Sequence, residues 1–177
     1  AAVYLNGLLA GTHTGGYTAF TLDITKLLRE GENTLTVAVR DDTDTVPLAR
    51  GKQKTKRGGI WYTPQSGIWQ TVWAELVPER YIESLLFTPE LPEGRIRWRV
   101  FSAPPHGAKV SLTYQDEPVA EGRTDADGCG SAVIAPEQLH LWTPETPELY
   151  DVTVTLGADT VKSYFAMRTV GTGQDTA

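Results

Sequence analysis

Apolar and polar residues alternate with a period of two along most of the chain. The clearest stretches are residues 34–39, 95–100, 108–115 and 152–156. Successive side chains of a β-strand point to opposite faces of a sheet, so alternation places one set in a core and the other in water. A helical period is confined to about one turn at residues 25–28, where Asp23 or Thr25 is the expected cap. The pattern predicts an all-β protein.

Turn residues separate the predicted strands at short intervals. Asn6-Gly7 lies between two apolar runs, and Asp127-Gly128 lies between the runs 119–123 and 131–134. Such dipeptides favour tight hairpin turns, so both sites are interpreted as hairpins. Many short strands joined by turns are typical of β-sandwiches and not of βαβ units.

The strands are expected to form two domains, with a boundary near Pro78-Glu79-Arg80. Residues 1–78 offer about five strands, whereas a jelly roll needs about eight, so we expect its N-terminal strands to be missing. Residues 79–170 offer about seven strands, the number typical of an immunoglobulin-like β-sandwich. Residues 171–177 are expected to be a tail or a severed linker.

The segment Gly67–Val77 has apolar residues at both odd and even positions. Ile68 and Val72 fall on one face of an extended chain, and Trp69 and Trp73 fall on the other. A strand that is apolar on both faces is normally covered on both, so we predict a buried strand here.

Composition narrows the classes of partner. The net charge of −6 disfavours nucleic acid, whose phosphates need a positive surface. The basic run at residues 50–57 is interpreted as a solvated loop in preference to a phosphate site, because neither aromatic interleaving nor a helix accompanies it in the sequence. No apolar run is long enough to span a bilayer, and the single cysteine, Cys129, slightly favours a reducing, cytoplasmic compartment.

Four segments, in order, resemble glycoside hydrolase family two, which includes β-galactosidases, β-glucuronidases and β-mannosidases. The first comprises residues 3–7, 15–20 and 22–25, which are similar to the family's sugar-binding jelly roll. The others are residues 59–73, 141–150 and 164–168. The most specific of them is Gly59–Trp73, which resembles the strand that closes this jelly roll. The resemblance implies a galactose-binding-like jelly roll followed by an immunoglobulin-like sandwich.

The same resemblance bears on catalysis. Retaining enzymes of this kind use two carboxylates, and in the family both are glutamates on a barrel that follows the segment ending at Arg168. The Asn-Glu pair that marks the family's acid/base residue occurs nowhere in the 177 residues. We therefore expect no catalytic residue, metal or cofactor here, and interpret the chain as an accessory region that supports and rims a catalytic barrel.

An acidic loop follows the predicted strand at 34–39. Asp41, Asp42 and Asp44 are candidate substrate-binding residues, because carboxylates accept hydrogen bonds strongly from sugar hydroxyls. Two alternatives stay open. In one, the aspartates form a polar turn that ends a strand, and in the other, their oxygens hold a cation.

Residues 46–66 form a long stretch without clear periodicity, which is unusual in a compact domain unless it serves a function. Trp61 and Tyr62 are candidate substrate-binding residues, because an aromatic ring offers apolar area to the C–H face of a sugar. The alternative is that they pin the loop to the sandwich or to the barrel.

The expected partners are a carbohydrate, bound through the active site of the parent enzyme, and the catalytic barrel. Neither nucleic acid nor a membrane is expected. Self-association through an open sheet edge is a further possibility, since unpaired strand edges invite pairing. The alternative functions are a free-standing carbohydrate-binding module and a structural interaction module.

Overall fold

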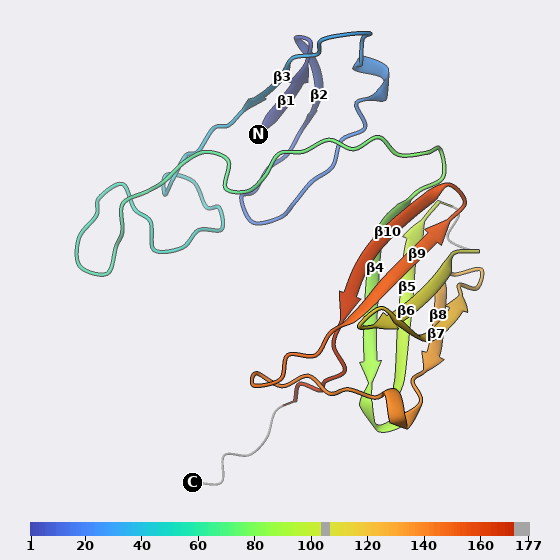
Figure 1. Cartoon of the computed structure of the whole chain (residues 1–177). Helices are drawn as coiled ribbons and strands as arrows, with labels where there is room; N and C mark the ends of the chain where they lie inside the picture. Colours follow the sequence, from blue (N-terminus) through green and yellow to red (C-terminus); the bar gives the residue numbers. More distant parts are fainter. Residues whose placement is uncertain (104–106, 172–177) are drawn as a thin grey trace. The chain divides into compact units, whose positions relative to one another are not determined.

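The computed structural model describes residues 1–103 and 107–171. The chain divides into two units, unit 1 (Ala1–Trp73) and unit 2, which begins at Ala74 (Figure 1). The regular elements of both units are mainly strands, and the helices of the described residues are single 3-10 turns, so the all-β prediction is confirmed. None of these helices is long and apolar enough to cross a membrane. Most of the predicted tail, residues 172–177, lies outside the described residues.

Unit 1 contains a three-stranded antiparallel sheet in the order β2-β1-β3. Its strands are β1 (Ala2–Leu5), β2 (Leu8–Thr12) and β3 (Leu35–Ala38). Asn6 and Gly7 turn the chain between β1 and β2 with φ values of 53° and 80°, so the first predicted hairpin is confirmed. Asparagine and glycine accept this left-handed backbone more readily than other residues, which explains the choice of dipeptide.

The Asn6 side chain also connects this hairpin to the 3-10 helix η1 (Thr25–Leu27) and to the start of β3. Its amide nitrogen donates to the Leu27 carbonyl oxygen at 3.1 Å and to Asn33 Oδ1 at 2.8 Å. Its Oδ1 accepts from the Thr34 amide at 3.0 Å. One polar side chain thus satisfies backbone groups from separate parts of unit 1.

The prediction of a buried strand at Gly67–Val77 is wrong. The structure gives this segment no strand, and all six of its large apolar side chains are exposed: Ile68, Trp69, Val72, Trp73, Leu76 and Val77. A strand needs a neighbour that supplies hydrogen-bonding groups. Among the described residues, no strand pairs with this segment.

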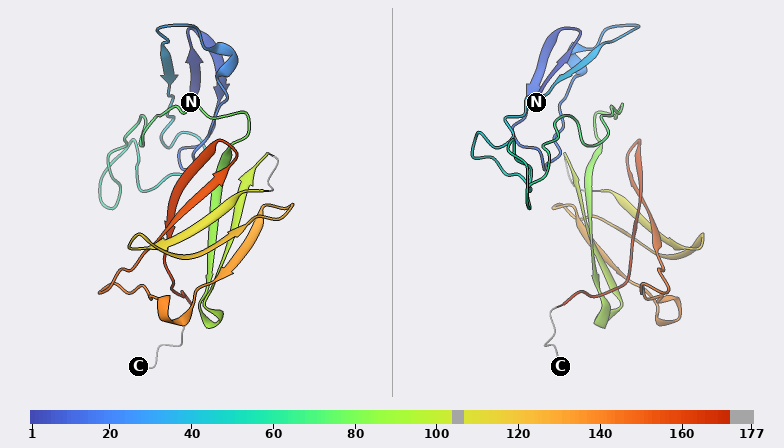
Figure 2. Two further views of the ribbon diagram at one scale, coloured as in Figure 1. Left: turned by 45° about the vertical axis from the view of Figure 1, so that its right-hand side comes forward. Right: turned by 90° about the vertical axis from the view of Figure 1, so that its left-hand side faces the viewer.

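Unit 2 is a sandwich of seven strands. Its strands are β4 (Ile82–Glu90), β5 (Arg95–Ser102), β6 (Lys109–Tyr114), β7 (Glu117–Arg123), β8 (Cys129–Val133), β9 (Tyr150–Leu156) and β10 (Asp159–Phe165). One sheet has the order β10-β9-β6-β7 and the other the order β4-β5-β8. The right-hand view of Figure 2 shows the two sheets as separate layers. Short 3-10 turns, η2 (Leu91–Glu93) and η3 (Pro136–Gln138), follow β4 and β8.

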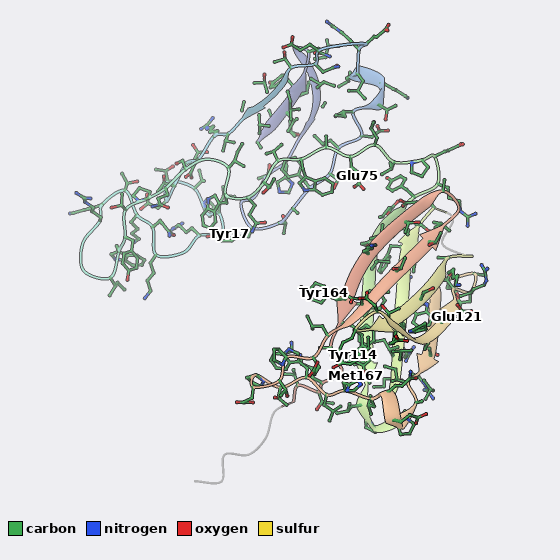
Figure 3. All side chains as sticks on the ribbon, viewed as in Figure 1. Tyr17, Glu75, Tyr114, Glu121, Tyr164 and Met167 are labelled. Atoms are coloured by element: carbon green, nitrogen blue, oxygen red, sulfur yellow. The ribbon has the colours of Figure 1, made fainter. Side chains whose placement is uncertain are left out.

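The alternating apolar residues of unit 2 meet between its sheets. The fully buried side chains include Ile96, Val100, Val110, Leu112, Tyr150, Val152, Val154 and Met167. They form one continuous core, and Figure 3 shows the labelled Met167 among these densely packed side chains. The Tyr150 hydroxyl is satisfied inside this core, since it donates to the Gln138 carbonyl oxygen at 2.7 Å and accepts from the His140 amide at 2.6 Å.

The second predicted hairpin, at Asp127-Gly128, is wrong. The turn joins β7 to β8, but β7 pairs with β6 whereas β8 pairs with β5. The turn therefore carries the chain from one sheet to the other. Asp125 stabilises it locally, because its Oδ1 accepts from the amides of Asp127 (2.9 Å) and Cys129 (2.8 Å). Turn chemistry alone does not reveal whether the flanking strands pair with each other.

Candidate functional site

The candidate site is the loop of residues 41–66 in unit 1, which follows β3. Asp41 closes this loop at its base: its Oδ2 accepts from the Ser66 hydroxyl at 2.7 Å, and its Oδ1 accepts from the Thr43 amide at 2.7 Å. These bonds favour the ionised carboxylate, so the Ser66 hydroxyl first, and then the Thr43 amide, lower the pKa of Asp41. The bond between Asp41 and Ser66 therefore joins two residues that lie 25 positions apart in the sequence.

Asp44 makes a second connection across the loop. Its Oδ1 accepts from the Thr55 hydroxyl at 2.7 Å and from the Thr55 amide at 3.3 Å. The same two bonds, in this order, are the main causes that lower the pKa of Asp44, and the positive charge of Arg50 adds to them. We call the Asp41–Ser66 and Asp44–Thr55 contacts the two loop clips.

Asp42 has a more local role. Its Oδ1 accepts from the Arg40 guanidinium at 2.8 Å, and its carbonyl oxygen accepts from the amide and the hydroxyl of Thr45. Among the described residues, no group of three or more histidine, cysteine or acidic side chains is arranged to hold a metal ion. The cation interpretation of the acidic loop therefore has no support in this geometry.

Trp61 and Tyr62 lie on a narrow turn in the same loop. Gly58 and Trp61 exchange both backbone hydrogen bonds at 3.1 Å, and Gly58 and Gly59 both have positive φ, which glycine tolerates. The Tyr62 amide donates to the Lys52 carbonyl oxygen at 2.8 Å, and the Lys54 amide donates to the Tyr62 carbonyl oxygen at 3.1 Å. Both rings remain accessible, with 38% of Trp61 and 63% of Tyr62 exposed.

The structure brings the basic run against these aromatic residues. Lys54 Nζ lies 4.1 Å from the centroid of the Trp61 ring, within the range of a cation–π contact. No aromatic residue interleaves with the run in the sequence, but the turn at Gly58 folds Trp61 back onto Lys54. We call residues 50–62 the basic turn.

The five candidate residues do not converge on one point. No hydrogen bond or ring contact among the described residues joins Asp41, Asp42 or Asp44 directly to Trp61 or Tyr62. The connection is indirect, since Asp44 holds Thr55 and Thr55 follows Lys54, which covers Trp61. In Figure 3 the side chains of this loop extend away from the ribbon.

Two contacts were not anticipated from the sequence. One is Lys54 over Trp61, for which the signal was the row of alternating lysines shortly before an aromatic pair. The other joins Tyr17 and Trp69, whose rings meet edge to face at 5.9 Å although the residues are far apart in the chain. Both rings are largely exposed. Nothing in the local pattern around Tyr17 indicates this partner.

Comparison with known proteins identifies relatives for nearly the whole chain. The family model for glycosyl hydrolases family 2 matches residues 80–168, half of the chain. A putative beta-glucuronidase from Formosa agariphila is 29% identical over 87% of this chain and 19% of its own length. The beta-glucuronidase of Sus scrofa is 27% identical over 90% of this chain and 28% of its own length. The beta-galactosidase of Thermoanaerobacter pseudethanolicus is 25% identical over 90% of this chain and 22% of its own length.

Solved structures show the same fold. A beta-glucuronidase from Ruminococcus gnavus superimposes with a TM-score of 0.70 over 96% of this chain and 31% of that protein, at 21% identity. A beta-glucuronidase from Dictyoglomus thermophilum gives a TM-score of 0.67 over 96% of this chain and 32% of that protein, at 22% identity. The chain therefore spans less than a third of the length of these relatives.

Proposed function

The chain belongs to glycosyl hydrolases family 2, and from this premise we propose that it is the accessory region of an enzyme that hydrolyses O-glycosidic bonds of β-linked sugars. The observation that carries the proposal is the family match over residues 80–168, which covers the sandwich of unit 2. The names of the relatives include both glucuronidases and a galactosidase, so they support a glycosidase without fixing the sugar.

In the proposed reaction, the bond is cleaved with retention by two carboxylates, of which one protonates the leaving oxygen and one attacks the anomeric carbon. We assign neither role to a residue of this chain, because the family's Asn-Glu pair does not occur in it. Both carboxylates would come from a barrel outside these residues. The contribution of residues 1–177 is to support that barrel and to shape the approach to it.

Unit 2 suits the role of a rigid support. Its two sheets enclose one continuous apolar core, in which the Tyr150 hydroxyl also has both of its hydrogen-bond partners. A packed core of this kind resists deformation, because side chains interdigitate with little free volume. Unit 2 can therefore hold neighbouring parts of an enzyme at a fixed spacing.

The loop of residues 41–66 suits the role of a rim that contacts sugar. The two loop clips restrain it before any ligand binds, which reduces the entropy that binding would otherwise cost. The exposed rings of Trp61 and Tyr62 offer apolar area for the C–H face of a sugar. Asp41, Asp42 and Asp44 have spare lone pairs with which to accept from sugar hydroxyls.

Kinetics of the full-length protein, as encoded by its gene, test this role. We expect Trp61→Ala or Tyr62→Ala to raise KM for a β-glycoside about two- to tenfold, the worth of one aromatic contact, and to leave kcat nearly unchanged. The matched control is Tyr164→Ala, since Tyr164 is similarly exposed but lies on β10 of unit 2. If KM is unchanged in both loop variants, or rises as much in the control, the rim role is wrong.

A further inference from the structure

The charges of the basic turn are unlike those of the remaining chain. Residues 45–66 contain five cationic side chains and no carboxylate: Arg50, Lys52, Lys54, Lys56 and Arg57. The chain has 16 lysine and arginine residues against 22 acidic residues, so its other parts are even more acidic than the net charge of −6 indicates. The basic turn is thus a local positive patch on an acidic protein.

Four cations elsewhere in the described part of the chain have carboxylate partners. Arg40 pairs with Asp42, Arg95 and Arg97 share Glu90, and Lys109 pairs with Glu121. Within the part of the chain that the structure describes, Lys52, Lys54 and Lys56 form no such ion pair. Like charges at this density repel one another, so a bound anion would relieve a cost that the folded loop otherwise bears.

The backbone of the basic turn is already ordered. It is fixed by the paired bonds of Gly58 with Trp61, by the bonds between Tyr62 and the backbone of Lys52 and Lys54, and by the Asp44–Thr55 clip. Lys52 and Lys56 are exposed, whereas Lys54 is half-buried against Trp61. The turn therefore presents ammonium groups beside aromatic rings on a restrained scaffold.

From this arrangement we propose that the basic turn binds the anionic groups of an acidic glycan, either uronate carboxylates or sulfate esters. Ammonium groups supply charge-assisted hydrogen bonds to such oxygens. Trp61 and Tyr62 supply the apolar surface that a sugar ring, unlike a free inorganic anion, is able to use. Because the remainder of the chain is strongly acidic, it disfavours a long polyanion such as nucleic acid more than a short glycan that carries few charges. The inference rests on the proposed function and deepens it by naming the class of sugar.

The test measures binding by the full-length protein with calorimetry at low salt. The probes are oligogalacturonate, its carboxyl-reduced form, dextran sulfate oligosaccharides, unsulfated dextran and single-stranded DNA. The triple variant Lys52→Gln, Lys54→Gln, Lys56→Gln removes the charges and retains polar side chains of similar length. The matched control is Lys26→Gln, Arg29→Gln, Lys162→Gln, which changes the net charge equally at exposed positions outside the basic turn.

We expect the triple variant to lose about fivefold or more in affinity for at least one acidic probe, since each charge-assisted hydrogen bond contributes measurably. The control should bind as the natural protein does, and the neutral probes should be bound equally by all three proteins. A loss of affinity for oligogalacturonate identifies carboxylate as the bound group, and a loss for dextran sulfate identifies sulfate. A second triple variant replaces each of the three lysines with arginine and so keeps the positive charges. It should retain the affinity, which would show that the loss in the glutamine variant comes from removing charge and not from a folding defect.

Three results would overturn the inference. They are unchanged affinity of the glutamine variant for both acidic probes, an equal loss in the control, and DNA binding as tight as glycan binding with the same dependence on the three lysines. Hydrolysis of neutral β-glycosides is followed in parallel. If hydrolysis persists while the binding difference is absent, only this inference fails. If no β-glycoside is cleaved while acidic binding persists, the proposed function fails instead.

Discussion

Trp98, in the middle of β5, is a buried member of the core between the sheets of unit 2. Its indole is buried against two glycines, Gly122 on β7 and Gly130 on β8. A Cβ atom at Gly130 would lie 2.5 Å from Trp98 Nε1 and 2.7 Å from the Arg123 carbonyl oxygen. The glycines therefore provide the room for a large ring where the chain crosses between sheets. Trp98 Nε1 itself is buried without a hydrogen-bond partner among the described residues.

This crowding predicts that Gly130→Ala destabilises the protein by about 1–3 kcal/mol, the usual cost of overpacking a core. The rigid Arg123 carbonyl leaves the added methyl little room to shift. Denaturant unfolding followed by tryptophan fluorescence measures the loss. Gly171→Ala is the matched control and should be near neutral, because a Cβ there meets nothing within 4 Å. Equal stability of the two variants would contradict the packing described for Trp98.

Tyr114, at the end of β6, gives a prediction about pH. Its hydroxyl donates to Glu148 Oε2 at 2.6 Å, and this bond, with the negative charge of Glu148, raises the pKa of Tyr114 above its ordinary value of 10.0. A raised pKa means that the contribution to stability is complete below pH 10.0 and is lost as pH rises through the folded-state value. Burial raises the pKa of Tyr150 as well, so the wild type alone does not isolate Tyr114.

We therefore expect wild type and Tyr114→Phe to differ in melting temperature at pH 8 and to converge as the pH rises past 10. Differential scanning calorimetry across that range measures the convergence. A constant difference at all pH values would show that the hydroxyl contributes through packing alone and not through its bond to Glu148.

At the scale of elements, the loop of residues 41–66 is held by side chains and not by a sheet. The two clips bind Thr55 and Ser66 to aspartates near β3, and the only β-bridges in the loop are isolated ones around Tyr62 and Trp61. Loops restrained by a few polar contacts open locally at low free-energy cost compared with core strands. The loop should therefore respond to the loss of a single carboxylate.

Asp44→Ala should accelerate amide hydrogen exchange at Thr55 and Tyr62 while leaving β1 and β3 unchanged. The Asp44–Thr55 clip should also open in the wild type at low pH. The bonds from Thr55 lower the pKa of Asp44, so the clip is complete above pH 3.8 and is lost as pH falls through the folded-state pKa. Hydrogen exchange followed by mass spectrometry resolves the loop from the strands. Glu32→Ala, at an exposed position in the same unit, is the control. No acceleration in Asp44→Ala would mean that the clip does not restrain the loop.

The elements also show which features of the fold are local enough to be predicted. The alternation at 95–100 and 152–156 predicted β5 and β9 because a period of two is a property of the segment itself. The apolar segment at 67–77 and the turn at Asp127-Gly128 were misinterpreted because strand pairing is non-local. Whether a strand forms, and with which partner, depends on residues that no local pattern identifies.

At the scale of the molecule, the family and the all-β class were apparent from the ordered motifs, whereas the site was apparent only in part. The sequence identified Asp41, Asp42, Asp44, Trp61 and Tyr62 as candidates, but it did not show that the aspartates and the aromatic residues make no direct contact. Lys54 was overlooked because its contact with Trp61 depends on the turn at Gly58 and Gly59. The exposed apolar side chains of residues 67–77 remain a surface for which the described residues provide no cover.

The central claim is that residues 1–177 support and rim a glycosidase whose bond-cleaving carboxylates lie elsewhere. The most direct measurement is the release of nitrophenol from a panel of nitrophenyl β-glycosides, including the galactoside, the glucuronide and the mannoside. It is carried out with the full-length protein as encoded and, separately, with residues 1–177 alone. The account predicts turnover of at least one substrate by the full-length protein and none by residues 1–177. Turnover by residues 1–177 alone, or no turnover of any β-glycoside by the folded full-length protein, would contradict it.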